Sequence, residues 1–269
     1  MFNDIVIVRG GGDLASGTIQ KLHRSGFRIL VLEVEKPTAI RRSVSFSEAV
    51  YEREIEIEGI IAVHVCSLSE VEDAWSNKKI PVIIDEEGKY IQKIKPKIVV
   101  DAIIAKKNMG TTKNMADITI AIGPGFIAGK DVDVVIETTR GHNLGRLIFV
   151  GEAEKNTGIP GNIMGYSKER VIHSTCAGIM KNVLDIGAVV EKDEVIAYIG
   201  ETPIKATISG LLRGIIRSGS TVSRGFKIAD IDPRVSEKMN CYTISDKARN
   251  IAGGVLEAVF YLTTVQKEN

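Results

Sequence analysis

The stretch Ile5-Val6-Ile7-Val8-Arg9-Gly10-Gly11-Gly12-Asp13-Leu14-Ala15-Ser16-Gly17 decides the fold that the sequence predicts. An apolar run of strand length meets a glycine turn, a helix-like stretch follows to Ser25, and a second apolar run over 29–32 ends at Glu33. This order is typical of an α/β unit that places backbone N–H groups at a helix N-terminus, where a phosphate can bind. The sequence therefore predicts a site for a nucleotide or another phosphorylated molecule.

The glycine turn matches a dinucleotide-binding fingerprint. Gly10, Gly12 and Ala15 fit the pattern G-x-G-x-x-G/A, and Glu33 lies where an acid can bind a ribose hydroxyl. Asp13 argues for the alternative of a plain turn, because its carboxylate can compete with a phosphate for the same N–H groups. The candidate binding residues here are Gly10, Gly11, Gly12, Asp13, Leu14, Ala15 and Glu33.

Composition excludes several classes of function. The 269 residues are 44% hydrophobic and 26% charged, with a net charge of +1, so no overall field attracts nucleic acid or an anionic membrane. The three cysteines are far apart, which favours neither a zinc knuckle nor a disulfide framework. No signal-like segment and no apolar run of membrane length is present, so we expect a cytoplasmic protein.

Residues 1–155 alternate between strand-like and helix-like segments and predict a Rossmann-like α/β domain. Strands rich in Val and Ile are expected at 5–8, 28–33, 60–65, 80–84, 97–104, 118–122, 132–137 and 146–150. The segment 35–58 is charged and less regular. Within it, Arg41-Arg42-Ser43 is interpreted either as a cover over the ligand site or as a solvated face. The glycine-rich segment 151–165 is expected to connect two domains.

An internal repeat with an offset of 32 residues follows that connection. Gly178-Ile179-Met180 corresponds to Gly210-Leu211-Leu212, and the match continues to Ile199 with Ile231. Residues 166–236 thus resemble the β barrel-sandwich hybrid of biotinyl and lipoyl carrier domains. Lys205 lacks the sequence context of a carrier lysine, so we expect neither biotin nor lipoate. A C-terminal helix over 243–264 is expected to pack back on the first domain or on a partner subunit.

A second group of candidate residues follows two of the predicted strands. It comprises Gly123, Gly125, Glu137, Arg140, His142 and Arg146. Arginines can bind phosphate bidentately, His142 can transfer a proton, and Glu137 can orient it. The alternative is a solvated glycine-rich turn. Asp101 is expected either to face a ligand or to pair with a lysine, and Asp230 and Asp232 either to share a metal or to pair with Arg234. The histidines lack metal-site spacing, and no metal site is predicted.

Many blocks of the chain resemble the YqeB-type accessory family of selenium-dependent molybdenum hydroxylases. The resemblance rests on stretches that occur in the same order, namely 9–17, 39–42, 101–106, 123–126, 137–142, 156–161, 232–234 and 243–249. The chain departs from the family pattern at 173–178, so no family role is carried over to Cys176. The chain is also distantly similar to xanthine dehydrogenase accessory proteins.

The resemblance implies a bacterial maturation factor that helps to prepare or deliver the molybdenum cofactor, or a selenium ligand on it, to a molybdenum hydroxylase apo-enzyme. The glycine fingerprint also allows an NAD(P)-like dinucleotide as the bound cofactor. The expected site combines the turn 10–15 and Glu33 with Arg41, opposite 123–125 and 137–146. No catalytic residue is implied, and whether the chain is an enzyme stays open. The alternatives are an NAD(P)-dependent oxidoreductase and a non-catalytic scaffold for the apo-enzyme, and a homo-oligomer is possible in either case.

Overall fold

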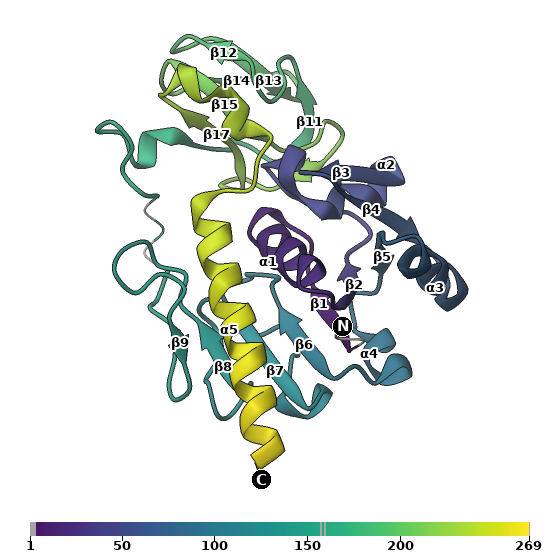
Figure 1. Cartoon of the computed structure of the whole chain (residues 1–269). Helices are drawn as coiled ribbons and strands as arrows, with labels where there is room; N and C mark the ends of the chain where they lie inside the picture. The colour runs from purple at the N-terminus through teal and green to yellow at the C-terminus, as the bar shows by residue number, and fades with distance from the viewer. Residues whose placement is uncertain (1–3, 157, 159, 269) are drawn as a thin grey trace. The chain divides into compact units, whose positions relative to one another are not determined.

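The computed structural model describes residues 4–156, 158 and 160–268 (Figure 1). The chain divides into two compact units. Unit 1 comprises Met1–Pro37, Ser45–Asn156 and Ile244–Asn269, and unit 2 comprises Thr38–Val44 and Thr157–Thr243. Each unit is thus assembled from segments that lie far apart in the sequence.

Unit 1 is built on a nine-stranded sheet with the order β3-β4-β5-β2-β1-β6-β7-β8-β9. Its strands are β1 (Ile5–Arg9), β2 (Arg28–Glu33), β3 (Glu54–Ile57), β4 (Ile60–Val65), β5 (Ile80–Ile84), β6 (Ile98–Asp101), β7 (Ile118–Ile122), β8 (Val134–Ile136) and β9 (Leu147–Ile148). The seven central strands from β4 to β8 are parallel, and β3 and β9 run antiparallel at the two edges.

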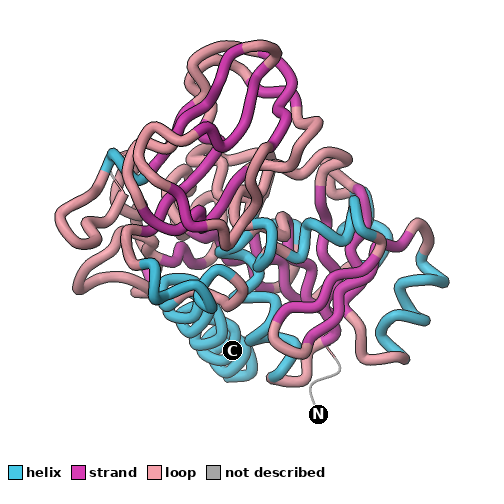
Figure 2. The backbone as a smooth tube through the Cα atoms, turned by 90° about the horizontal axis from the view of Figure 1, so that it is seen from above, coloured by secondary structure: helices cyan, strands magenta, loops and turns pink. Residues whose placement is uncertain are grey.

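Helices cover both faces of this sheet. Figure 2 shows the helices in cyan and the strands in magenta. Alternate residues of each strand point to opposite faces, so Val6 and Val8 pack with α1 (Asp13–Arg24) and α5 (Asp246–Glu268). Ile7 points to the other face and packs with α3 (Leu68–Ser76) and α4 (Lys89–Ile94). Because both faces are covered, the central strands are largely apolar, and polar residues such as Arg9 and Asp101 stand at strand ends.

The segment that the sequence left irregular contains a short helix, α2 (Ala49–Glu52), and the hairpin of β3 and β4. Glu58 and Gly59 join the two strands, with φ values of +50° and +78°. A turn with two positive φ values matches the twist of an antiparallel hairpin. The hairpin makes one edge of the sheet antiparallel.

Unit 2 contains two four-stranded antiparallel sheets. One has the order β10-β17-β15-β12 and the other β14-β13-β11-β16. The strands are β10 (Val171–His173), β11 (Gly178–Asn182), β12 (Val189–Val190), β13 (Val195–Ile199), β14 (Thr202–Lys205), β15 (Gly210–Ile215), β16 (Thr221–Val222) and β17 (Lys227–Asp232). The predicted repeat is visible in the backbone, because Gly178 and Gly210 share a φ of +157°.

The predicted fold class, a Rossmann-like domain followed by a barrel-sandwich hybrid, is corrected. The sheet of unit 1 is mixed, because the hairpin over 54–65 and the return of β9 on β8 add antiparallel strands at its edges. Unit 2 consists of two separate antiparallel sheets and also takes in residues 38–44 from the N-terminal half of the chain.

Candidate functional site

The glycine turn after β1 is closely packed at two of its three glycines. A Cβ on Gly10, where φ is +91°, would lie 3.0 Å from the Cα of Ile103, and one on Gly11 would lie 2.9 Å from the Ser47 nitrogen. Gly12 differs, because a Cβ there would meet nothing within 4 Å and its φ is −66°. The turn is therefore open to a ligand only at Gly12.

Glu33 lies at the end of β2 and binds the turn directly. Its carboxylate accepts hydrogen bonds from the N–H groups of Gly11 at 2.7 Å and Val34 at 2.8 Å. Burial raises the pKa of Glu33, the two N–H groups oppose that shift, and nearby Glu48 and Glu86 add to it. The structure thus brings Glu33 to the turn as predicted, but as a partner of the Gly11 amide.

The N-terminus of α1 lacks a side-chain cap. Gly12 stands at the N-cap position and has no side chain that could cap the helix. The Gly12 carbonyl accepts the Ser16 N–H at 2.8 Å and the Ser16 hydroxyl at 2.9 Å. The first N–H groups of an α-helix point out of its N-terminus and carry a partial positive charge. This end of α1 is suited to an anion, although Asp13 adds a carboxylate there.

Helix α5 runs beside α1 in the same direction (Figure 1). A Cβ on Gly17 would lie 2.7 Å from the carbonyl oxygen of Ala248, and one on Gly253 would lie 3.9 Å from the Lys21 ammonium. The contacts advance together along both helices, so the helices are parallel. Since α1 follows β1, both N-termini lie at the carboxyl ends of the parallel strands. The positive ends of two helix dipoles therefore lie together at the carboxyl ends of the strands.

Lys247 lies in the first turn of α5 and is the residue that sequence reasoning missed. Burial lowers the pKa of the Lys247 ammonium, and the charge of Arg140 lowers it further. The carboxylates of Asp13, Glu137 and Asp246 oppose this shift. These influences place Lys247 near the start of α1 and the end of β8. The signal in the sequence was limited to Ser245, whose hydroxyl accepts the Ala248 N–H at 3.2 Å and caps α5.

Glu137 follows β8 and closes the loop behind it. One carboxylate oxygen accepts the N–H groups of Thr138 and Thr139, both at 2.7 Å, and the other accepts that of Glu154 at 2.8 Å. The side chain is buried, so three backbone donors satisfy its charge. The role of Glu137 in this structure is to fix the loop.

The two glycines after β7 allow close contacts of their own. A Cβ on Gly123 would lie 2.9 Å from the Thr138 hydroxyl, and one on Gly125 would lie 2.6 Å from the Cα of Lys107. Both have positive φ values, of +82° and +110°. Gly123 and Gly125 therefore pack the loops after β6, β7 and β8 against one another.

The predicted arginines and histidine do not form one phosphate clamp. Arg140 pairs with Asp246 at 2.9 Å, Arg146 donates to Asn143 at 3.3 Å, and both lie on the surface with His142. Arg41 belongs to unit 2, where it donates to the carbonyl oxygens of Asn240 at 2.9 Å and Thr243 at 3.1 Å. Of these three arginines, Arg140 is the one whose charge lowers the pKa of Lys247.

Asp101, at the end of β6, belongs to a buried network. It accepts a hydrogen bond from Thr111 at 2.6 Å and lies 3.7 Å from Arg9, which also donates to the Thr111 hydroxyl. Burial raises the pKa of Asp101, whereas Thr111, the Ile103 N–H and Arg9 oppose the shift. Asp101 thus pairs with an arginine of the neighbouring strand and not with a nearby lysine.

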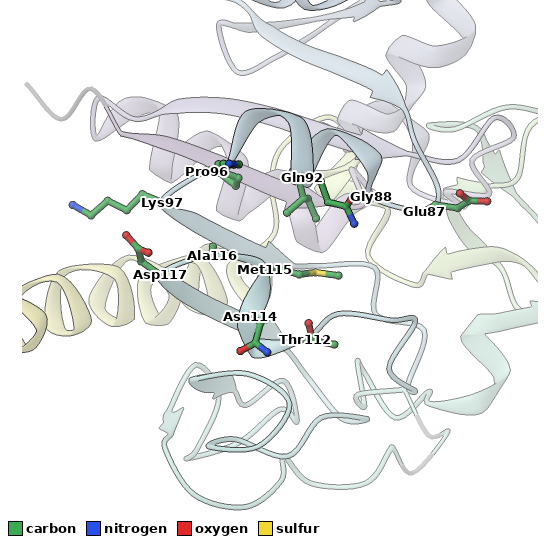
Figure 3. Close-up of a pocket in the computed structure, with 12 residues that line it drawn as sticks. Glu87, Gly88, Gln92, Pro96, Lys97, Thr112, Asn114, Met115, Ala116 and Asp117 are labelled. Atoms are coloured by element: carbon green, nitrogen blue, oxygen red, sulfur yellow. The ribbon is translucent and has the colours of Figure 1, made fainter.

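The described residues of unit 1 border at least two pockets. One of about 370 Å³ is bordered by Glu137, Asn143, Arg146 and Glu154, beside the loop after β8. A larger one of about 950 Å³ lies between α4 and the segment 112–117, and no residue of the glycine turn lines it (Figure 3). Its lining includes Gln92, Lys97, Asn114 and Asp117, and the figure shows no convergence of these side chains on one point.

Within residues 4–156, 158 and 160–268, no group of three or more His, Cys, Asp or Glu side chains is arranged to hold a metal ion. No helix in this described part is long and apolar enough to cross a membrane.

No protein-family model matches the chain. The chain is 48% identical over 260 residues to the uncharacterized protein YqeB of Escherichia coli (strain K12). That alignment covers 97% of this chain and 48% of the relative, so the chain spans about half the length of the curated relative it matches.

Among solved structures, the chain shows a weak likeness to the ectoine utilization protein EutE (DoeB) from Ruegeria pomeroyi, with 10% identity and a TM-score of 0.25 over 85% of each chain. It shows a similarly weak likeness to a succinylglutamate desuccinylase from Silicibacter sp. TM1040, with 11% identity and a TM-score of 0.25 over 85% of this chain and 84% of that one. An aspartoacylase family protein from Mesorhizobium loti gives a TM-score of 0.26 at 11% identity over the same shares.

These names correct the function predicted from the sequence. They name an ectoine utilization protein, a succinylglutamate desuccinylase and an aspartoacylase family protein, and none of them names an accessory factor of molybdenum or selenium enzymes, an NAD(P)-dependent oxidoreductase or a scaffold. The predicted role as a maturation factor for a molybdenum or selenium enzyme is therefore withdrawn, together with its two alternatives. TM-scores near 0.25 assign no deacylase activity to this chain.

Proposed function

We propose that unit 1 binds a phosphorylated small molecule at the N-termini of α1 and α5. The observation that carries the proposal is that these two helices lie side by side and parallel. Both begin near Lys247, at the carboxyl ends of the strands. Ligands of open α/β sheets bind outside this edge of the sheet. A phosphate there would face outward-pointing N–H groups and the positive ends of two dipoles.

The open space at Gly12 gives the ligand access to this site. The position has room for a phosphate oxygen to approach the first N–H groups of α1, since even an added Cβ would touch nothing within 4 Å. Gly10 and Gly11 have a different role, because the close approach of Ile103 and Ser47 fixes the course of the turn. The Gly11 amide donates to Glu33, so the phosphate is held beyond it, at the start of the helix.

Lys247 supplies a positive charge whose protonation should respond to the ligand. Its ammonium is partly buried beside like charge from Arg140, which disfavours the protonated form. A phosphate nearby would favour that form through Coulomb attraction. Binding should therefore raise the Lys247 pKa and take up a proton at alkaline pH.

The experiment is calorimetric titration of the chain with inorganic phosphate and with pyrophosphate. Replacement of Lys247→Gln removes one charge-assisted contact of about 1.5–3 kcal/mol, so affinity should fall about tenfold to a hundredfold. Gly253→Ala is the matched control on the same helix, because its Cβ would lie 3.9 Å from the nearest atom, the end of a flexible lysine. It should leave affinity unchanged.

Two results would count against the proposal. Absence of heat for both anions in the wild-type chain would refute phosphate binding. Equal affinities of wild type and Lys247→Gln would remove Lys247 from the site.

A further inference from the structure

Unit 2 contains a β-bulge whose extra residue is Arg213. Leu212 of β15 pairs with Ile231 of β17, and Gly214 pairs with the preceding residue, Asp230, so the register shifts across Arg213. Bulges redirect a side chain and occur often beside functional sites. The bulge is held from the other side, because a Cβ on Gly214 would lie 3.0 Å from the carbonyl oxygen of Ile40.

The side chains of Arg213 and Arg170 both pair with the carboxylate of Asp230. Arg213 lies 3.3 Å from one oxygen of Asp230, and Arg170, from the short helix η4 (Lys168–Arg170), lies 3.5 Å from the other. The side chains of Arg170 and Asp230 are 5% and 9% exposed. The three charges sum to +1 in a largely buried place, where an uncompensated charge is costly.

The two arginines differ in what their N–H groups do. Arg170 donates to the carbonyl oxygens of Ile231 and Gly161, both at 3.1 Å, in addition to its pairing with Asp230. Within the part of the chain that the structure describes, Asp230 is the hydrogen-bond acceptor found for Arg213. The Arg213 side chain is 19% exposed, so the rest of its guanidinium can reach a ligand from solvent.

A second ion pair, between Asp232 and Arg234, begins on the same strand two residues after Asp230. Asp232 accepts from the Arg234 guanidinium at 2.9 Å and 2.7 Å, a bidentate arrangement. Burial acts to raise the pKa of Asp232, but the hydrogen bonds and charge of Arg234 bring it below its usual range. Asp232 also attracts Arg170, and when this pair is included the three arginines and two aspartates still sum to a charge of +1.

We propose that Arg213 forms an oxyanion site in unit 2, where it binds a phosphate or carboxylate group of a small molecule. Asp230 and Arg170 are positioning residues that hold the Arg213 guanidinium at the bulge. Arginine suits this role because its planar fork matches two oxygens of such a group. The site is separate from the one proposed in unit 1 and does not depend on it.

The test follows the guanidinium directly by NMR of the full chain with labelled arginine. Titration with inorganic phosphate and, separately, with acetate should shift the Arg213 Nε–Hε resonance in a saturable way. The arm that saturates at lower concentration identifies the oxyanion class. A resonance that stays in place, or that moves linearly to high salt like those of exposed arginines, would overturn the proposal.

Variants give an independent measurement. Arg213→Gln should lose the saturable binding in unit 2, Arg213→Lys should weaken it by about tenfold through loss of the second N–H contact, and Arg224→Gln should retain it. Arg224 is a matched control because it is an exposed arginine of the same unit. Retained binding in Arg213→Gln would refute the assignment. If that variant does not fold, the wild-type resonance decides alone. The Gly12→Asp variant, altered in unit 1, should keep the Arg213 shift.

Discussion

Substitution Gly12→Asp should stabilise the fold and abolish phosphate binding. An aspartate is among the best N-cap residues, and the backbone at Gly12 already has the extended N-cap conformation, with φ −66° and ψ −179°. The added Cβ meets no atom within 4 Å, so no strain opposes the gain. Cap and dipole together are worth about 0.5–1 kcal/mol, which corresponds to a rise in melting temperature of roughly 2 °C.

The same carboxylate would take the N–H groups that the proposed site offers to a phosphate. Loss of one charge-assisted hydrogen bond costs about 1.5–3 kcal/mol, so affinity should fall by at least about tenfold, and charge repulsion adds to this. Gly12→Ser separates the two effects, because its hydroxyl caps the helix without charge. It should stabilise α1 and weaken binding less than Gly12→Asp.

Thermal unfolding and calorimetric titration of the three proteins provide the assay. The reasoning predicts that stability and affinity move in opposite directions. A variant Gly12→Asp that binds phosphate as the wild type does would refute the role of the α1 N-terminus. A less stable Gly12→Asp would refute the geometry assigned to the cap.

Three further predictions concern packing and pH. Gly17→Ala should cost about 1–3 kcal/mol of unfolding free energy, because its Cβ would lie 2.7 Å from the Ala248 carbonyl oxygen; an unchanged melting temperature would contradict this contact. The raised pKa of Glu33 means that the folded chain holds this proton more tightly than the unfolded chain. The free energy of unfolding should therefore fall as pH rises from the ordinary glutamate pKa through the raised one, and Glu33→Gln should flatten that decline in denaturation curves across pH. Gly210→Ala should destabilise unit 2 more than Gly178→Ala in the same measurement, since the first meets a backbone carbonyl at 2.5 Å and the second a side-chain methyl at 2.7 Å; the reverse order would contradict these two contacts.

The sequence predicted the central strands well because their signal is local. The strands at 60–65, 80–84 and 118–122 have the predicted bounds, as expected for Val- and Ile-rich segments buried on both faces. The start of α3 is also set by local sequence, since the Ser67 hydroxyl accepts the Glu70 N–H at 3.2 Å and Glu70 accepts the Cys66 N–H, which is close to a capping box.

The sheet edges and the assignment of segments to units depend on contacts that a single sequence does not display. The hairpin at 54–65 needs Glu58 in the left-handed region, where a glutamate is uncommon. Residues 38–44 join unit 2 through contacts such as that of Ile40 with Gly214, far away in the sequence. Neither feature leaves a periodic pattern.

The candidate site was predicted only in part, because some of its residues are brought together by long-range contacts. Glu33 was found because the βαβ spacing fixes its distance from the glycine turn, although its bond to the Gly11 amide was not foreseen. Lys247 was missed because its surroundings arise from the packing of α5 on α1 at Gly17. Arg213 was missed because a bulge depends on the register of two strands and not on the residue itself.

The most direct test of phosphate binding at the helix N-termini is amide NMR of the full chain during titration with inorganic phosphate. The account predicts that the largest saturable shifts occur at the amides of Asp13 and Leu14 and in the first turn of α5, around Lys247. Saturable shifts confined to other parts of unit 1, or no shifts in either helix, would contradict it.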